Sequence, residues 1–186
     1  MEFILNLDRE LFFFLNGLNN SFFDVVMSSI SGRLTWIPLY AFLLYLLIRK
    51  YKWKTIWIVL AIILLTFLAD QTANLFKASF QRLRPCQDDE INHMVHFLSC
   101  GGRYGFISGH AANTFALATF VAFLFKDRSF LYLRIIFFSY AALNAYSRIY
   151  LGVHYPGDVI AGALVGSMLG MGMYFLLNRL KLVRNS

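Results

Sequence analysis

A histidine and an aspartate stand four residues apart in the segment SRIYLGVHYPGD (147–158), which separates two long apolar stretches. If a helix begins there, the carboxylate of Asp158 can reach one imidazole nitrogen of His154. Such a contact fixes the tautomer and leaves the other nitrogen free to attack an electrophile or to take a proton. The spacing therefore indicates an oriented, nucleophilic histidine. In a simpler interpretation, Asp158 only complements the dipole of the following helix.

Three cations could bind an anion beside this histidine. Lys77 and Arg84, in KASFQRLRP (77–85), are seven residues apart, so they share a face if the preceding helix continues. Pro85 then disfavours helical geometry at Arg84 and ends the segment. Arg148 follows the predicted end of another helix, where a cation is favourable. Alone, Lys77 and Arg84 could equally be interfacial residues whose charged ends reach water.

The segment ISGH (107–110) has the sequence of a helix start. Ser108 is a good N-cap, and Gly109 lets a ligand approach the backbone closely. The first amides of that helix lack intrahelical acceptors and can bind an anion, although simple capping with an interfacial His110 would also explain the segment. Combined with the three cations, this helix start describes a pocket for a phosphate group. The sequence holds no compact set of carboxylates for magnesium, so the cations would take the place of a metal.

The composition indicates an integral membrane protein. Of the 186 residues, 59% are hydrophobic and 15% are charged, more apolar surface than a soluble chain of this size can bury. The net charge of +7 does not indicate a nucleic-acid partner, because the basic residues flank apolar runs instead of clustering on one soluble face. Five runs are predicted to be transmembrane helices, with flanking residues where a run is short: 34–48, 55–76, 111–125, 130–146 and 159–177.

We therefore predict an all-α fold, with residues 1–186 forming a single membrane helical bundle of about five transmembrane helices. Residues 1–32 are predicted to form two short amphipathic helices at the membrane surface, and a sixth crossing in this segment is the alternative. Acids at positions 2, 8 and 10 replace the basic start of a cleaved signal peptide, so we expect none.

The distribution of basic residues predicts the orientation in the membrane. One side holds nine: Arg49, Lys50, Lys52, Lys54, Lys126, Arg128, Arg179, Lys181 and Arg184. The other side holds seven, diluted by acids: Arg9, Arg33, Lys77, Arg82, Arg84, Arg103 and Arg148. The positive-inside rule places the first set in the cytoplasm. The candidate site would then face the periplasm or the exterior, and we expect a bacterial inner membrane.

Three motifs at these positions resemble the signature of the type 2 phosphatidic acid phosphatase family: Lys77 with Arg84-Pro85, Ser108-Gly109-His110, and Ser147-Arg148 followed by His154 and Asp158. That family includes membrane lipid phosphatases and, as soluble members, bacterial acid phosphatases and vanadium haloperoxidases. The haloperoxidase activity is not expected in a membrane chain. Ile107 stands where the family usually has proline, a departure that removes no catalytic group.

The resemblance implies a role for each residue of the catalytic signature region (77–158). His154 would attack phosphorus and form a phosphohistidine, with Asp158 orienting it. His110 would protonate the leaving oxygen and then activate the water that hydrolyses the intermediate. The phosphate oxygens would be held by Lys77, Arg84, Ser108, Gly109 and Arg148. The resemblance implies neither a metal nor another cofactor.

Two further sets of residues lie in the loop between the second and third apolar runs. Cys86 and Cys100 could form a disulfide that braces the loop in an oxidising compartment, or could remain two free thiols. His93 and His96, with the acids at positions 88–90, lack a defined metal-ligand pattern and are interpreted as a polar outer loop.

The predicted function is hydrolysis of a lipid phosphate or pyrophosphate at the outer leaflet. Undecaprenyl pyrophosphate is the favoured substrate, and the lipid A 1-phosphate, phosphatidylglycerol phosphate and phosphatidic acid are alternatives. A phosphotransferase would pass the phosphoryl group to a second lipid instead of water. A transporter or channel would place its charges in mid-helix instead of at helix ends. The expected partners are the lipid substrate and membrane lipids, and the sequence predicts no oligomeric state.

Overall fold

The computed structural model describes residues 2–32 and 34–183, and helices are the regular elements that these ranges form. Arg33 and Arg184, which entered the charge count above, lie outside the described residues. The helices are α1 (Glu2–Asn16), α2 (Ser21–Ser31), α3 (Ile37–Tyr51), α4 (Thr55–Phe80), α5 (Gly109–Leu124), α6 (Leu131–Tyr150) and α7 (Pro156–Arg179). The predicted all-α class is confirmed, and five of these helices correspond to the five apolar runs.

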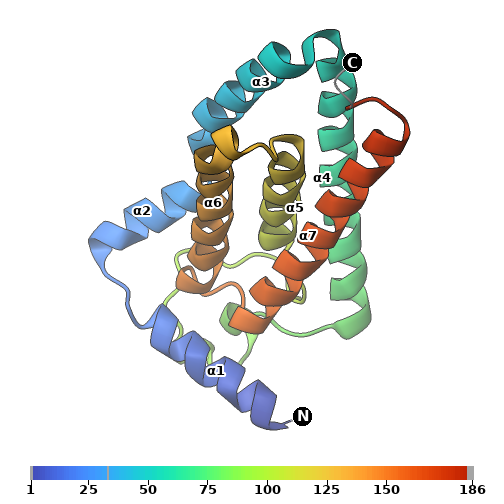
Figure 1. The fold of residues 1–186 in the computed structure, drawn as a ribbon. Coiled ribbons are helices and arrows are strands. Elements are labelled where there is room, and N and C mark those ends of the chain that lie inside the picture. Colours follow the sequence, from blue (N-terminus) through green and yellow to red (C-terminus); the bar gives the residue numbers. More distant parts are fainter. Residues whose placement is uncertain (1, 33, 184–186) are drawn as a thin grey trace.

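Helix α5 is the central helix of the bundle. It packs against α4, α6 and α7, while α1 lies across one end of the bundle and α2 lies beside α6 (Figure 1). Nine of its 16 residues are buried, so the helix is covered on most sides. A helix in that position must be apolar all round, which explains why its sequence shows hardly any amphipathic pattern.

Small residues bring α5 and α7 into close contact. Gly162, Gly166 and Gly170 face the backbone of α5, and a Cβ atom at Gly162 would lie 2.5 Å from the Ser108 carbonyl oxygen. Such small-residue stripes let two helix backbones approach. The Ser108 amide also donates to the Asp158 carbonyl at 2.9 Å. The first turns of α5 and α7 are therefore held at a fixed separation.

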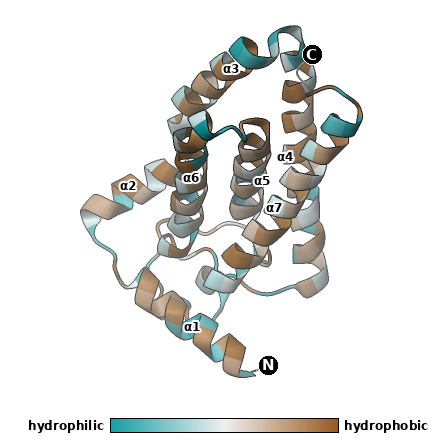
Figure 2. Cartoon of the chain, in the orientation of Figure 1, coloured by the Kyte–Doolittle hydropathy of each residue, from teal (hydrophilic) through white to brown (hydrophobic). Residues whose placement is uncertain are grey.

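Length and hydropathy support a membrane location. Two helical stretches, Leu34–Phe80 and Pro156–Arg179, are long and apolar enough to cross a bilayer. Apolar residues predominate along these helices (Figure 2). Helices α3 and α5, with 15 and 16 residues, are shorter than the roughly 20 residues that a crossing needs. The count of five crossings therefore remains a prediction.

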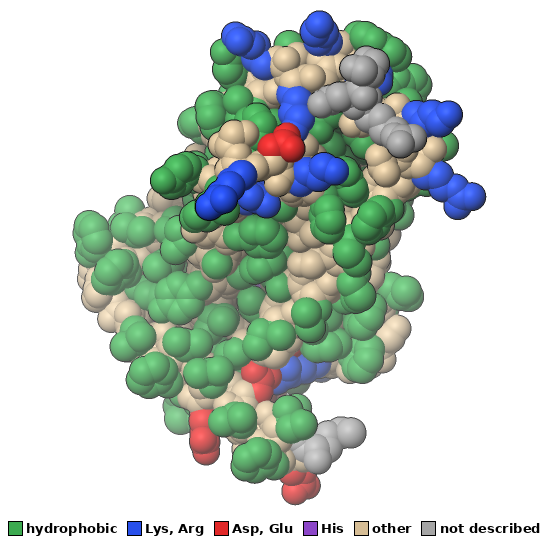
Figure 3. All heavy atoms as spheres, viewed as in Figure 1, with side chains coloured by type: hydrophobic (Ala, Val, Ile, Leu, Met, Phe, Trp, Pro, Cys, Tyr) green, Lys and Arg blue, Asp and Glu red, His purple; other side chains and the backbone are tan. Residues whose placement is uncertain are grey.

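Basic side chains gather at one end of the molecule. Figure 3 shows them where α3 turns into α4, at the end opposite α1. One acid there, Asp127, forms an ion pair with Lys50, with 3.2 Å between Oδ2 and Nζ. The residues of the candidate site lie near the other end, so the described residues keep the separation of charges on which the predicted orientation rests.

The N-terminal segment forms two helices, as predicted. With 15 and 11 residues, α1 and α2 are too short to cross a bilayer one at a time. Helix α1 is docked on the bundle: Phe12 is fully buried and meets Tyr155 edge to face, with ring centroids 5.3 Å apart. Asn16 is buried too, and its side-chain amide donates to the Tyr150 carbonyl at 2.8 Å.

Candidate active site

A cavity of about 710 Å³ opens among α3, α4, α5 and α6. Six of the predicted site residues line its polar end: Lys77, Arg84, Gly109, His110, Arg148 and His154. Ser108 and Asp158 are fully buried directly behind this lining. The structure therefore brings together residues from two helices, one helix start and two loops, as the sequence predicted.

His154 lies in the loop before α7 and is 2% exposed. Its Nδ1 atom lies 3.5 Å from Asp158 Oδ2, a long contact, and no hydrogen-bond partner for Nδ1 occurs within the described ranges. Asp158 Oδ2 also accepts from the Tyr155 amide at 3.0 Å. The carboxylate thus faces Nδ1, and Nε2 is left as the nitrogen on the far side of the ring.

Burial controls the charge of this histidine. It lowers the pKa of His154 to about 4, although the nearby Asp158 carboxylate opposes the shift and Arg84 and Arg148 add to it. The imidazole is therefore neutral at neutral pH, the form that has a lone pair to donate.

Arg84 reaches the site from a loop and not from a helix. Helix α4 ends at Phe80, because Gln81 adopts a left-handed conformation (φ 48°) and its amide caps the helix on the Lys77 carbonyl. The helix therefore does not continue far enough for Lys77 and Arg84 to share a helix face, and the prediction that Pro85 disfavours helical geometry at Arg84 is confirmed. Arg84 is extended, and its Nε donates to the Tyr104 carbonyl at 3.2 Å. Burial lowers the pKa of the Arg84 guanidinium, so an anion that compensates its charge is favoured there.

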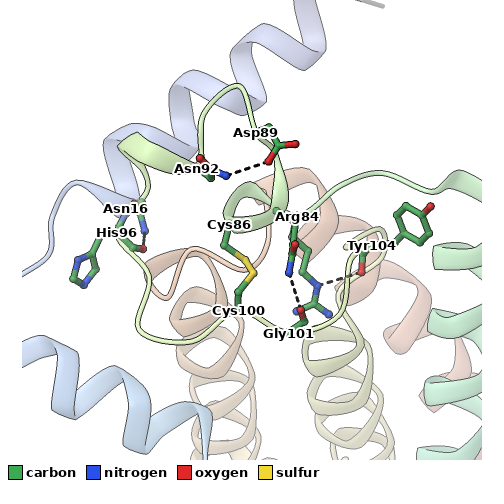
Figure 4. The surroundings of a disulfide bond; sticks show 10 residues. Asn16, Arg84, Cys86, Asp89, Asn92, His96, Cys100, Gly101 and Tyr104 are labelled. Carbon is green, nitrogen blue, oxygen red and sulfur yellow. Dashed lines mark hydrogen bonds between the residues drawn. A yellow bond between two sulfur atoms is a disulfide. The ribbon is translucent and has the colours of Figure 1, made fainter.

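A disulfide between Cys86 and Cys100 ties the two sides of this loop together, with 6.0 Å between the Cα atoms (Figure 4). The residue after Cys100 packs directly on the site: a Cβ atom at Gly101 would lie 2.6 Å from Arg84 Nη1. The loop backbone therefore limits the positions that the Arg84 guanidinium can take.

The start of α5 has the predicted capping geometry. Ser108 is the N-cap, and its hydroxyl accepts from the Ala111 amide at 3.5 Å. Gly109 and His110 line the cavity, whereas Ser108 lies beneath its surface. A Cβ atom at Gly109 would lie 3.6 Å from Lys77 Nζ, so the lysine ammonium lies beside the first amides of α5.

Arg148 lies within α6, not beyond its end as the sequence analysis expected. The helix continues to Tyr150 because Ile149 and Tyr150 are buried and keep packing against neighbouring elements. Arg148 Nη1 donates to the Ser31 hydroxyl, and Nε is buried without a hydrogen-bond partner in the part of the chain that the structure describes. The side chain is therefore anchored by α2 while it lines the cavity.

Sequence reasoning missed Arg82, which contacts Asp158, and Asp8, which contacts Arg82. Arg82 Nη1 donates to Asp158 Oδ1 at 2.9 Å, and Nη2 donates to Asp8 Oδ2 at 2.7 Å. Asp8 Oδ1 in turn accepts from the Gly157 amide at 2.7 Å. In the sequence, Arg82 and Asp8 are recognisable only as charged residues, because no spacing pattern links positions so far apart.

The polar outer loop is fixed by other contacts. His96 Nε2 lies 2.8 Å from Asp24 Oδ1 of α2, and Arg9 of α1 pairs with Asp88 and Glu90. Within residues 2–32 and 34–183, no three His, Cys, Asp or Glu side chains are grouped as metal ligands. The loop thus connects the N-terminal helices to the bundle.

Known proteins are similar to this chain in sequence and in fold. Residues 54–181 match the PAP2 superfamily. The lipid A 4'-phosphatase of Bacteroides thetaiotaomicron is 40% identical over 97% of this chain and 81% of its own length. The lipid A 4'-phosphatase of Porphyromonas gingivalis is 36% identical over 94% of this chain and 74% of its own length.

Two crystal structures are similar to the whole bundle. Aquifex aeolicus LpxE has a TM-score of 0.66 and 31% identity, covering 90% of this chain and 94% of its own. The PAP2-type phosphatidylglycerolphosphate phosphatase of Bacillus subtilis has a TM-score of 0.72, with 97% and 87% coverage. Because this protein is only 23% identical, the likeness shows a shared fold and nothing more.

Proposed function

Since the chain belongs to the PAP2 superfamily, we propose that it is a lipid A phosphatase that removes the 4'-phosphate at the outer face of the membrane. The phosphate monoester hydrolase class rests on the family and on its phosphatase relatives. The choice of lipid A rests on relatives that match nearly the whole chain. They favour lipid A over undecaprenyl pyrophosphate, and they favour its 4'-phosphate, whereas the alternative named from the sequence was its 1-phosphate.

The cavity is the observation that supports a lipid substrate. Beyond its cationic end, the walls are apolar side chains from α3, α4 and α5, among them Leu43, Leu47, Ile62, Ile63 and Leu117. A ligand that fits such a cavity combines an anionic group with long apolar chains. A phosphorylated lipid has both parts, whereas a water-soluble phosphate ester would leave most of the cavity unfilled.

The reaction follows from the neutral histidine. Nε2 of His154 attacks phosphorus, forming a P–N bond while the bond to the leaving oxygen breaks. His110 donates the proton that this oxygen needs. A water molecule, deprotonated by His110, then attacks the phosphohistidine, so that phosphate leaves and the imidazole becomes neutral again.

Positive charge around the phosphate lowers the activation barriers for formation and for hydrolysis of the phosphohistidine. Lys77, Arg84 and Arg148 line the cavity next to the amides at the start of α5. Donors fixed before the reaction stabilise the charge that develops on the equatorial oxygens, and removing one such donor typically costs about 2.7–4 kcal/mol. Asp158 keeps Nδ1 oriented throughout both steps.

A substrate panel tests this proposal. Purified protein in detergent, with EDTA present, is given lipid A with only the 4'-phosphate, lipid A with only the 1-phosphate, undecaprenyl pyrophosphate, phosphatidylglycerol phosphate or phosphatidic acid. We expect the fastest phosphate release from the 4'-phosphate and none from His154→Ala. A clear preference for another lipid would contradict the choice of lipid A. Loss of phosphate release whenever a second lipid acceptor is omitted would indicate a phosphotransferase.

A further inference from the structure

Helix α1 makes a specific polar contact with the start of α7. The Asp8 carboxylate accepts from the Gly157 amide at 2.7 Å, and its side chain is only 11% exposed. A Cβ atom at Gly157 would lie 2.9 Å from Asp8 Oδ2, so a larger residue there would displace the carboxylate. A carboxylate is favourable at this position because the first amides of a helix lack acceptors and the dipole is positive there.

Arg82 connects this carboxylate to Asp158. It lies between two acids, with N···O distances of 2.7 Å to Asp8 and 2.9 Å to Asp158, and its guanidinium stacks 4.1 Å above the Tyr155 ring. Asp158 is fully buried, so its negative charge needs a cation to compensate the lost hydration. Arg82 supplies that cation.

These contacts fix both oxygens of the Asp158 carboxylate. Oδ1 is held by Arg82, and Oδ2 accepts from the Tyr155 amide while facing His154. We propose that Arg82 and Asp8 are positioning residues for the nucleophile, acting through Asp158. Helix α1 then contributes to the active site although it does not line the cavity.

Two other roles for Arg82 predict different observations. A phosphate-binding residue would line the cavity, and Arg82 is not among the residues that do. If Arg82 only anchored α1, its replacement would lower the stability of the protein without changing kcat of the molecules that remain folded. Replacement of a positioning residue lowers kcat but leaves phosphate binding the same, because the groups that hold the phosphate are untouched.

The inference rests on the proposed phosphohistidine mechanism but not on the identity of the lipid. Its test therefore uses p-nitrophenyl phosphate, whose hydrolysis does not depend on recognition of lipid A. If lipid A failed as a substrate, this assay would still report on Arg82. The variants are Arg82→Gln, Arg82→Lys, Asp8→Asn and the double variant Arg82→Gln/Asp8→Asn.

For Arg82→Gln we expect kcat to fall about 10- to 100-fold, the effect of losing one hydrogen bond to a buried charge. Competitive inhibition by inorganic phosphate and KM should stay within about threefold. Arg82→Lys should recover part of kcat, and Asp8→Asn should lower it less than Arg82→Gln. The double variant should be little worse than Arg82→Gln alone, because both residues act through the same carboxylate.

The matched control is Arg9→Gln, at the next residue on α1. Arg9 pairs with Asp88 and with the exposed Glu90, not with Asp158, so this variant should keep its activity. Thermal unfolding in detergent shows whether each variant is folded. If Arg82→Gln does not fold, Arg82→Lys and Asp8→Asn still decide the question. The proposal is overturned if kcat of the folded variants stays within about twofold of the unsubstituted protein, or if inhibition by inorganic phosphate weakens in parallel with kcat.

Discussion

Replacement of Gly166 by alanine tests whether the contact between α5 and α7 sets the geometry of the site. A Cβ atom at this position would lie 2.8 Å from the Ala112 carbonyl carbon and 2.9 Å from its Cα. Ordinary contacts begin at 3.4 Å. The obstacle is backbone, which cannot rotate away as a side chain would, so the two helices must separate by roughly half an ångström or more.

The cost can be estimated from two opposing effects. Overpacking of a well-packed core costs about 1–3 kcal/mol, while alanine in place of glycine gains up to about 1 kcal/mol of helix propensity. We expect a net loss of about 1–2 kcal/mol, or a fall in Tm of roughly 2–8 °C for a chain of this size. Since Asp158 and the first turn of α5 face each other across this contact, kcat should also fall by about tenfold or more.

Gly172→Ala is the matched control, because a Cβ atom at that position of the same helix would meet nothing within 4 Å. It should raise Tm slightly and leave kcat unchanged. Thermal unfolding in detergent and phosphate release measure both effects. Equal Tm and kcat for the two variants would show that the close approach of α5 and α7 does not determine the site.

Four further predictions concern the chemistry and the topology. His154→Ala should remain folded and abolish turnover, whereas His110→Ala should be less severe for p-nitrophenyl phosphate than for a lipid, because nitrophenolate leaves without a proton; equal losses would refute the acid role. Arg148→Lys should cost about 2–4 kcal/mol of transition-state stabilisation and weaken vanadate binding, since the planar fork is lost; a variant close to the unsubstituted protein would refute this. His154 should lose its nucleophilic form only as the pH falls through about 4, so an acid limb of kcat/KM near 6.5, the ordinary pKa of histidine, would contradict its burial. In intact cells, Cys100 should react with an impermeant maleimide after mild reduction, whereas Lys52→Cys as the single cysteine of the chain should not react until the membrane is permeabilised; the reverse pattern would place the site in the cytoplasm.

The sequence predicted the helices well because their signals are local. Each apolar run became a helix with bounds shifted by a few residues, and Ser108 and Pro156 mark the starts of α5 and α7 as expected. The three signature segments also lie together as predicted, since consecutive helices alternate in direction and each segment lies at a helix end on the same side of the bundle. Local spacing therefore identified the residues that line the polar end of the cavity.

The sequence failed where a position depends on distant contacts. Pro85 predicts that Arg84 is not helical, but the residue type of Gln81 does not predict the left-handed turn that ends α4 four residues earlier, at Phe80. The roles of Asp8 and Arg82 depend on contacts across 149 and 76 residues of sequence. Such contacts leave no periodic pattern, and a charged residue near a membrane surface is ordinarily explained as a solvated one.

The length of the cavity along α4 is close to the thickness of the hydrocarbon core of a membrane. Its lining follows α4 from Lys77 down to Val59, a distance of about 27 Å at 1.5 Å per residue. That length is close to the roughly 30 Å hydrocarbon core of a bilayer. An amphiphile can therefore keep its chains in apolar surroundings while its phosphate lies among Lys77, Arg84 and Arg148. A lipid bound in this way need not leave the membrane to be hydrolysed, so the binding energy of its chains can hold the phosphate against His154.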